Sequence, residues 1–174
     1  MKNERLQVLL SRDQISERVK ELAEAISRDY ADRNLLILCV LKGAVIFLAD
    51  LVRNLKVTPE LDFIAASSYQ RDNSKGKVDV SPMFSASVGG KDVLIVEDII
   101  DTGLTYRALI NYLAVREPAS LKLCTLLDKP SQRRTELIKP NYVGFTIPDK
   151  FVVGYGLDYE EKYRELPDIC ILVT

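Results

Sequence analysis

Hydrophobic residues recur along the chain with two alternating patterns, one helical and one typical of buried strands. A helix is predicted to begin after Ser11, because Ser11-Arg12-Asp13-Gln14 has the Ser-x-x-Gln form of a capping box. The apolar positions that follow have helical spacing: Ile15, Val19, Leu22, Ile26 and Tyr30. Glu and Lys fill the other face, so this segment is expected to be an amphipathic helix packed on a core.

Predominantly apolar runs of strand length separate the helical patterns. They predict strands at residues 35–41, 61–66, 93–96 and 121–127, and shorter β segments at 143–147, 152–153 and 169–173. Helices are expected at residues 44–52 and after the turn at 101–105, the second with Leu109, Ile110, Leu113 and Ala114 on one side. Runs without polar alternation suit strands covered on both faces. The sequence therefore predicts an α/β fold with a mainly parallel sheet.

The composition is that of one globular domain. The 174 residues include 24 Lys and Arg against 25 Asp and Glu, a net charge of −1, and 47% of them are hydrophobic. This charge gives no overall electrostatic reason to bind nucleic acid or an anionic membrane surface. The apolar runs also fall well short of the roughly 20 residues that span a bilayer. Neither a nucleic acid nor a membrane is therefore an expected partner.

The sequence contains no histidine, which excludes Ser-His-Asp and Cys-His nucleophiles and HExxH zinc sites. Catalysis must then use carboxylates, lysines, backbone amides or a hard metal ion. Cys39, Cys124 and Cys170 each lie inside an apolar run and lack CxxC spacing. Together with the absence of a signal segment, they predict buried free thiols in a reducing cytoplasm.

The most informative polar residues follow the run at 93–96. Glu97 and Asp98 are expected to end this strand, and Asp101-Thr102-Gly103-Leu104-Thr105 to form a turn at a helix start. Ligands of open α/β sheets collect at the carboxyl ends of strands. The free N–H groups of a helix start, with threonine hydroxyls beside them, suit a phosphate monoester. A plain helix cap beside solvated acids is the ordinary alternative, but three acids next to an anion site favour a bound cation or ligand.

Three further segments follow apolar runs, and each also has an ordinary structural interpretation. Leu41-Lys42-Gly43-Ala44 is compatible with a solvated lysine and a helix start, and residues 67–77 with an exposed loop or hairpin. Lys129 alone is compatible with a surface lysine, and Phe151 with a ring in an apolar stretch. None of these segments identifies a function by itself.

Taken together, these motifs resemble one family. VLIVEDIIDTGLT, at residues 93–105, is similar to the phosphoribosyl diphosphate (PRPP) signature of the type I phosphoribosyltransferases, in the form found in those acting on hypoxanthine and guanine. The resemblance extends in order through LKGA (41–44), SSY (67–69), LLDKP (126–130), IPDKFVVGYGLDY (147–159) and Tyr163-Arg164. Leu104 occupies a variable position of the turn, and Ala44 replaces a second glycine of some relatives.

The resemblance implies how PRPP is bound. Glu97 and Asp98 would face the ribose hydroxyls, and the turn from Asp101 to Thr105 would hold the 5′-phosphate. The backbone of Leu41, Lys42 and Gly43 would wrap the diphosphate, with a cis peptide bond expected between Leu41 and Lys42. Arg164 would bind the same diphosphate. Ser68 and Tyr69 would belong to a flap at residues 67–77 that closes over PRPP and excludes water.

The resemblance also assigns residues to the purine and to a metal ion. Lys129 would donate to the 6-oxo group, Phe151 would stack on the base, and the backbone of Val152 would meet the purine edge. Asp158 would complete the purine-binding set. Glu97, Asp98 and Asp158 would bind Mg²⁺, a hard cation that prefers carboxylate, water and phosphate oxygens. Asp101 would approach N7 and is the candidate general base.

The expected protein is therefore a purine salvage enzyme. It would transfer the phosphoribosyl group of PRPP to hypoxanthine, and to guanine, giving IMP or GMP and diphosphate. The resemblance implies one domain over residues 1–174, with a core at about 30–145 and a small hood from residues near the N-terminus and about 146–174, in a homodimer or homotetramer.

Three alternatives stay open at this point. They are a preference for xanthine or adenine, an RNA-binding regulator on the same fold, and a phosphate-binding module without catalysis. Lys129 and Phe151 disfavour adenine. The net charge of −1 and the lack of a long Lys/Arg cluster disfavour RNA.

Overall fold

The computed structural model describes residues 5–68, 78–83, 85–132 and 139–173. The helices are α1 (Arg12–Asp29), α2 (Val45–Asn54) and α3 (Leu104–Ala114), with a short 3-10 helix η1 (Pro130–Gln132). The strands are β1 (Arg5–Leu10), β2 (Leu35–Leu41), β3 (Glu60–Ser68), β4 (Val78–Pro82), β5 (Asp92–Ile100), β6 (Ser120–Asp128), β7 (Tyr142–Thr146), β8 (Val152–Val153) and β9 (Ile169–Val173).

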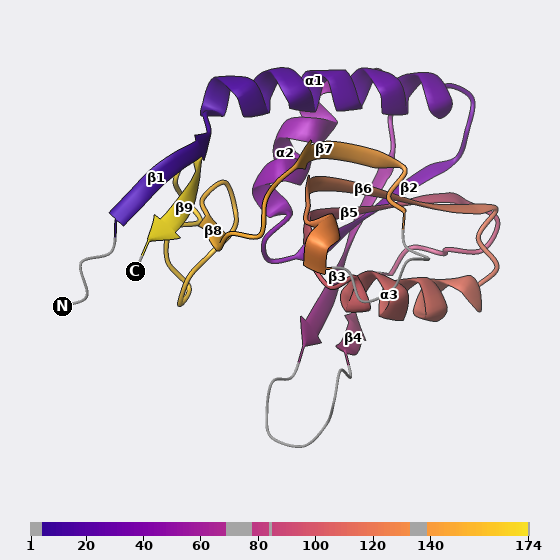
Figure 1. Ribbon diagram of the computed structural model, residues 1–174. Coiled ribbons are helices and arrows are strands. Elements are labelled where there is room, and N and C mark those ends of the chain that lie inside the picture. Colours follow the sequence, from indigo (N-terminus) through magenta and orange to yellow (C-terminus); the bar gives the residue numbers. More distant parts are fainter. Residues whose placement is uncertain (1–4, 69–77, 84, 133–138, 174) are drawn as a thin grey trace.

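A six-stranded sheet of order β4-β3-β2-β5-β6-β7 forms the centre of the molecule. Its neighbouring strands are parallel except for β4, which pairs antiparallel with β3. Figure 1 shows α1 and α2 on one face of this sheet and α3 on the other. The predicted α/β fold with a mainly parallel sheet is confirmed, because helices cover both faces of the apolar strands.

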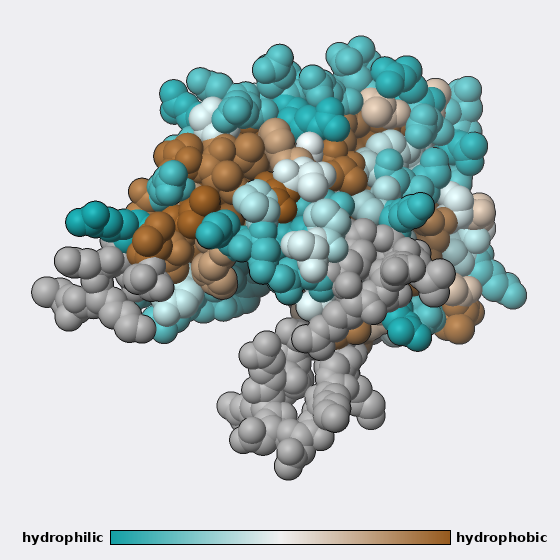
Figure 2. Space-filling view, viewed as in Figure 1, coloured by the Kyte–Doolittle hydropathy of each residue, from teal (hydrophilic) through white to brown (hydrophobic). Residues whose placement is uncertain are grey.

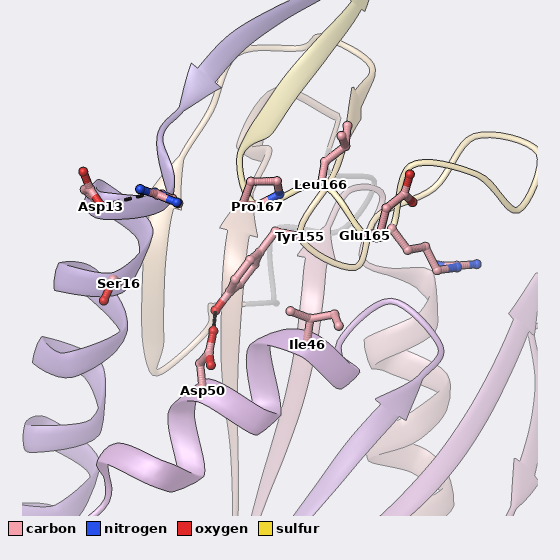
Figure 3. Close-up of a pocket in the computed structure, with 10 residues that line it drawn as sticks. Asp13, Ser16, Ile46, Asp50, Tyr155, Glu165, Leu166 and Pro167 are labelled. Atoms are coloured by element: carbon pink, nitrogen blue, oxygen red, sulfur yellow. Dashed lines mark hydrogen bonds and ion pairs between the residues drawn. The ribbon is translucent and has the colours of Figure 1, made fainter.

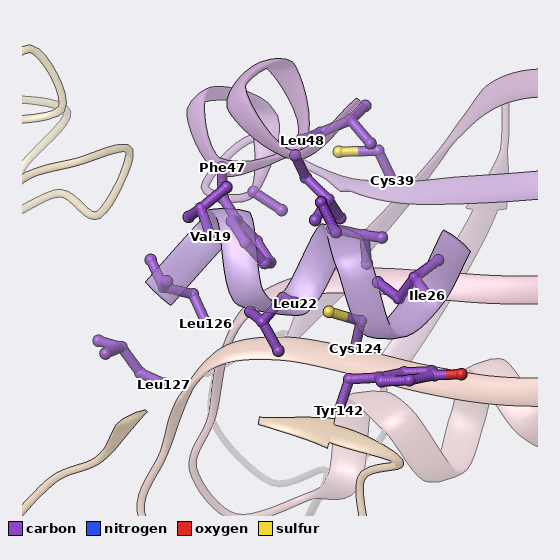
Figure 4. Close-up of a cluster of buried hydrophobic side chains, with 14 of the residues drawn as sticks. Val19, Leu22, Ile26, Cys39, Phe47, Leu48, Cys124, Leu126, Leu127 and Tyr142 are labelled. Atoms are coloured by element: carbon purple, nitrogen blue, oxygen red, sulfur yellow. The ribbon is translucent and has the colours of Figure 1, made fainter. Parts of the chain in front are cut away.

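The first helix has the start and the buried face that its sequence predicts. The Gln14 backbone N–H donates to Ser11 Oγ at 3.3 Å, and the Ser11 N–H donates to Gln14 Oε1 at 2.9 Å, which completes the capping box. The five predicted apolar positions are all buried. Figure 4 shows Val19, Leu22 and Ile26 of α1 in one cluster with side chains of α2 and the sheet, including the free thiols Cys39 and Cys124.

The two ends of the chain meet in a second, three-stranded sheet of order β1-β9-β8. We call this sheet and the loop at 154–168 the hood; Figure 1 shows it at one end of the central sheet. Figure 2, in the same view, shows hydrophobic residues at the surface of this end of the molecule, and Leu6, Val8 and Val173 of the hood are exposed. Arg12 N–H donates to Asp168 Oδ1 at 2.7 Å, and Tyr155 OH donates to Asp50 Oδ2 at 2.6 Å. These bonds join the hood to α1 and α2.

The structure corrects several details of the sequence interpretation. Strand β5 does not end at Glu97 and Asp98 but continues to Ile100, because it keeps pairing with β6 along this stretch. On α3, Ala114 was expected on the packed side but is exposed, and Tyr106, which was not predicted there, is buried. Strands β1 and β4 were not predicted. Within the described residues, no helix combines the length and apolar character needed to cross a membrane.

Candidate active site

The acidic pair lies inside β5, on opposite faces of the sheet, since successive strand residues point to opposite sides. Glu97 is buried on the side of α3, where burial and then the Glu97 charge raise the pKa of Tyr106. Asp98 faces the start of α2, and its Oδ1 accepts the Ile99 N–H at 2.8 Å. Burial, followed by the Asp98 charge, raises the pKa of Glu97 to about 8. Burial also raises the pKa of Asp98 to about 6.

The raised pKa of Glu97 predicts a pH-dependent stability of the unliganded protein. The native state favours the protonated form of Glu97. The stability that this form contributes is fully present below the ordinary pKa of 4.5 and is lost as pH rises through about 8. We expect the free energy of unfolding to fall across this range, and Glu97→Gln to flatten the fall. Urea unfolding at a series of pH values measures it. Glu24→Gln, on the exposed face of α1, is the control, and an equally steep fall in Glu97→Gln would contradict the prediction.

The turn after β5 joins the carboxyl edge of the sheet to α3. Gly103 is the N-cap of α3, and Thr102 Oγ1 accepts the Leu104 N–H at 3.4 Å. The first N–H groups of an α-helix have no acceptor within the helix, so they and the helix dipole favour an anion here. Asp101 is exposed and Thr105 half-buried beside this helix start. The turn therefore has the local geometry that a phosphate monoester needs.

The loop after β2 is held between Asp98 and the hood. The Leu41–Lys42 peptide bond is cis, as the resemblance implied. A Cβ built on Gly43 would lie 1.7 Å from Asp98 Oδ2, so only glycine lets the carboxylate pack against this loop. On the other side, Gly156 has a φ of +101°, and a Cβ there would lie 2.1 Å from the Gly43 carbonyl oxygen. Three segments distant in sequence thus meet around Gly43.

The hood supplies an arginine and two acids near this loop. Arg164 Nη2 lies 2.9 Å from Asp158 Oδ1, and its Nη1 donates to the Gly156 carbonyl oxygen at 2.7 Å. Lys42 Nζ lies 3.1 Å from Glu161 Oε2, and Arg164 Nη2 lies 3.4 Å from the same oxygen. Two cations suited to a diphosphate are therefore adjacent, and carboxylates of the chain contact both.

Lys129 and Phe151 lie on two segments that run beside each other. Lys129 is only 6% exposed, which is rare for lysine. Its backbone N–H donates to the Ile100 carbonyl oxygen at 2.9 Å. Ile147 N–H donates to the Asp128 carbonyl oxygen at 2.9 Å, which aligns the segment leading to Phe151 with the Lys129 segment. The half-exposed Phe151 ring meets Tyr159 edge-on at 5.7 Å, and Val152 is buried in β8.

The expected trio of metal ligands is not assembled. The described residues contain no group of three or more acidic or cysteine side chains arranged to hold a metal ion. Glu97 and Asp98 point to opposite faces of β5, so Glu97 cannot join Asp98 and Asp158 on the hood side. In this structure one oxygen of Asp158 contacts Arg164 and the other accepts the Glu161 N–H.

Ser68 is the last residue of β3, where its backbone pairs with Val78 of β4. Tyr69 and the rest of the expected flap, residues 70–77, lie outside the described residues. The flap therefore stays a prediction.

A cavity of about 390 Å³ lies between α1, α2 and the hood. Figure 3 shows Tyr155 pointing from the hood across it to Asp50 of α2. Arg164 is the single predicted site residue that lines this cavity. The cavity is therefore not the predicted substrate site.

Two residues of the site were not predicted from the sequence. Gly156 contacts Gly43 through the backbone, and Glu161 contacts Lys42 and Arg164. Gly156 stands within a motif quoted for the resemblance, yet its role depends on a left-handed φ and a distant contact. Glu161 gave no signal, because two consecutive glutamates normally indicate a solvated turn.

Together, the parallel sheet, the turn at 101–105 after its central strand and the cations beside Gly43 define an α/β protein whose sheet edge suits a phosphorylated sugar or nucleotide. The chain belongs to the phosphoribosyltransferase family, since the model described as phosphoribosyl transferase domain matches residues 9–160.

Similar proteins of known name agree with this family. The hypoxanthine-guanine phosphoribosyltransferase of Bacillus subtilis is 46% identical over 99% of this chain and 96% of its own length. The bifunctional protein TilS/HprT of Listeria monocytogenes is also 46% identical, but the chain spans only 26% of its length. A crystal structure of a hypoxanthine-guanine phosphoribosyltransferase from Bacillus anthracis superposes with a TM-score of 0.91 at 45% identity, covering 99% of this chain and all of that one.

Proposed function

We propose that this chain transfers the 5-phosphoribosyl group of PRPP to hypoxanthine and guanine, giving IMP or GMP and diphosphate. One observation carries the proposal. The phosphate-type turn, the Lys42 loop and the buried Lys129 follow the carboxyl ends of three neighbouring strands, β5, β2 and β6. Chemically different groups are thereby presented along a single edge of the sheet. The names of the full-length relatives support the choice of bases.

The reaction requires that the bond from ribose C1′ to the diphosphate oxygen breaks while a bond to purine N9 forms. The turn from Asp101 to Thr105 would fix the 5′-phosphate, and the Lys42 loop with Arg164 would hold the departing diphosphate. Such placement supplies catalysis by positioning and by stabilising the charge on the leaving group. Asp101, exposed beside the turn, would accept the proton that the purine loses at N7.

Magnesium suits the oxygen donors of this edge. After burial, the Asp158 charge raises the pKa of Asp98 while the Arg164 charge lowers it, so the two carboxylates repel each other and a second cation would stabilise both. Asp98 and Asp158 would hold Mg²⁺, with the remaining ligands from diphosphate and water. When bound, the ion would neutralise charge on the diphosphate.

Lys129, Phe151 and Val152 would read the base. The ammonium of Lys129 offers only donors, which matches a 6-oxo acceptor. Phe151 is 53% exposed, so its ring is accessible and would stack on any purine. Specificity for 6-oxopurines would therefore come mainly from Lys129.

Release of diphosphate from PRPP and Mg²⁺ tests the function against a panel of hypoxanthine, guanine, xanthine and adenine. We expect release only when a 6-oxopurine is present, with hypoxanthine and guanine the preferred bases. Faster turnover with xanthine or adenine would contradict the proposed specificity. The absence of turnover with every base would contradict the proposed transferase activity. The homodimer or homotetramer and the cytoplasmic location stay predictions; light scattering during size-exclusion chromatography measures the first.

A further inference from the structure

The hood contains a two-residue turn with an unusual sequence. Tyr159 and Lys162 exchange backbone hydrogen bonds of 3.1 and 3.0 Å, and Glu160 and Glu161 lie between them with φ values of 51° and 62°. A tight turn with two left-handed residues strongly favours Asn and Gly, because a side chain at such a φ is strained. The chain nevertheless places two glutamates there. Strained residues of this kind cluster at functional sites.

One of these glutamates forms ion pairs with the two cations that the proposed reaction needs. A single oxygen of Glu161, Oε2, contacts both Lys42 Nζ, at 3.1 Å, and Arg164 Nη2, at 3.4 Å. The Glu161 N–H is bonded to Asp158 Oδ2 at 2.9 Å, which fixes the turn beside the arginine. Hydrogen bonds from Lys42 and then Arg164 lower the pKa of Glu161, so its carboxylate is negatively charged at neutral pH. Glu160 has no contact of this kind among those the structure shows.

We propose that Glu161 is an internal competitor of the diphosphate group: its carboxylate holds Lys42 and Arg164 when diphosphate is absent and is displaced when diphosphate binds. The inference rests on the proposed function, since that function places a diphosphate at these two cations. A diphosphate oxygen can replace the carboxylate oxygen, because both accept hydrogen bonds from ammonium and guanidinium groups.

The geometry suits an exchange of this kind. The side chains of Lys42 and Glu161 are 69% and 66% exposed, and ion pairs at such exposure are weak. Arg164 keeps two other partners, Asp158 and the Gly156 carbonyl oxygen, so loss of Glu161 leaves its position fixed. Glu161 would therefore lower the affinity for diphosphate without disturbing the groups that bind it, and would speed release of the product.

Binding of diphosphate to the purified protein with Mg²⁺, measured by isothermal titration calorimetry without purine, tests the proposal. Glu161→Gln should bind diphosphate about tenfold more tightly than wild type, because two cations are freed and a repelling charge is removed. Glu160→Gln removes the same charge from the neighbouring position of the turn and should change affinity less than about twofold. In turnover, Glu161→Gln should lower both the KM for PRPP and the inhibition constant of diphosphate.

A double-mutant cycle separates competition from a general charge effect. In a Lys42→Gln background, Glu161→Gln should improve diphosphate affinity less than it does in the wild type. Unchanged or weaker binding in the single variant, or an equal gain with Glu160→Gln, would overturn the proposal. If the wild type transfers the phosphoribosyl group but Glu161→Gln binds diphosphate with wild-type affinity, only the competition by Glu161 is refuted. If the wild type binds no diphosphate, the proposed function is refuted as well.

Discussion

Replacing Lys129 with glutamine is expected to lower kcat/KM for hypoxanthine and to bring the rates with hypoxanthine and adenine much closer together. In the wild type, the Lys129 ammonium would meet the 6-amino group of adenine, leaving two donors opposed in a site where lysine is only 6% exposed. Sites that pair a polar group in this way reject a mismatched analogue by ~10⁴–10⁵-fold. Glutamine can turn its amide to offer either a donor or an acceptor, so most of this discrimination should disappear.

The ratio of kcat/KM for hypoxanthine to that for adenine, in wild type and Lys129→Gln, is the decisive measurement. Lys20→Gln, on the exposed surface of α1, is a matched control and should leave the ratio unchanged. If the ratio were the same in Lys129→Gln and wild type, backbone groups rather than Lys129 would read the 6-position.

Asp101→Asn should reduce turnover by roughly 10²-fold or more while PRPP still binds, because the amide keeps the size of the carboxylate but cannot accept the N7 proton. The anion site should survive, since it is built from the backbone of the turn and the start of α3. Single-turnover kinetics with PRPP and hypoxanthine measure the chemical step, and a separate titration measures PRPP affinity.

Asp32→Asn provides the control for Asp101→Asn. Asp32 is exposed in the turn before β2, at the opposite edge of the sheet, and its replacement should affect neither rate nor affinity. Full turnover in Asp101→Asn would remove Asp101 from the mechanism. Loss of PRPP binding together with turnover would assign Asp101 to the phosphate site instead.

The sequence predicts those elements whose signals are local. The capping box of α1 and its buried stripe depend on residues within a few turns of one another, and the apolar runs of β2, β5 and β6 are long enough to indicate a parallel sheet. Strand β1 gave no such signal, since Leu6 and Val8 are 42% and 56% exposed and its pairing partner, β9, lies at the other end of the chain. Strand β4 is an edge strand whose five residues include a proline.

The candidate site shows the same division. The phosphate-type turn and the buried acid Glu97 lie within or next to a recognisable motif, although only the strand pairing shows that both acids belong to β5. The contact between Lys42 and Glu161 joins residues 119 positions apart, and nothing near either residue indicates it. The metal set stays a prediction, but its geometry differs from the one that the sequence suggested: adjacency in sequence indicated one cluster, whereas alternation along β5 sends the side chains of Glu97 and Asp98 to opposite faces.

The contact between Gly156 and Gly43 bears on how this protein can be redesigned. It joins the hood to the loop at 41–43 through main-chain atoms, with no room for a Cβ on either glycine. Libraries that vary the flanking side chains while keeping both glycines and both loop lengths should preserve the spacing between the two segments. An insertion or deletion in either loop would instead shift one main chain against the other, and with it Asp98, which packs on Gly43. Loop length, more than residue choice, is therefore the property that engineering of this site has to conserve.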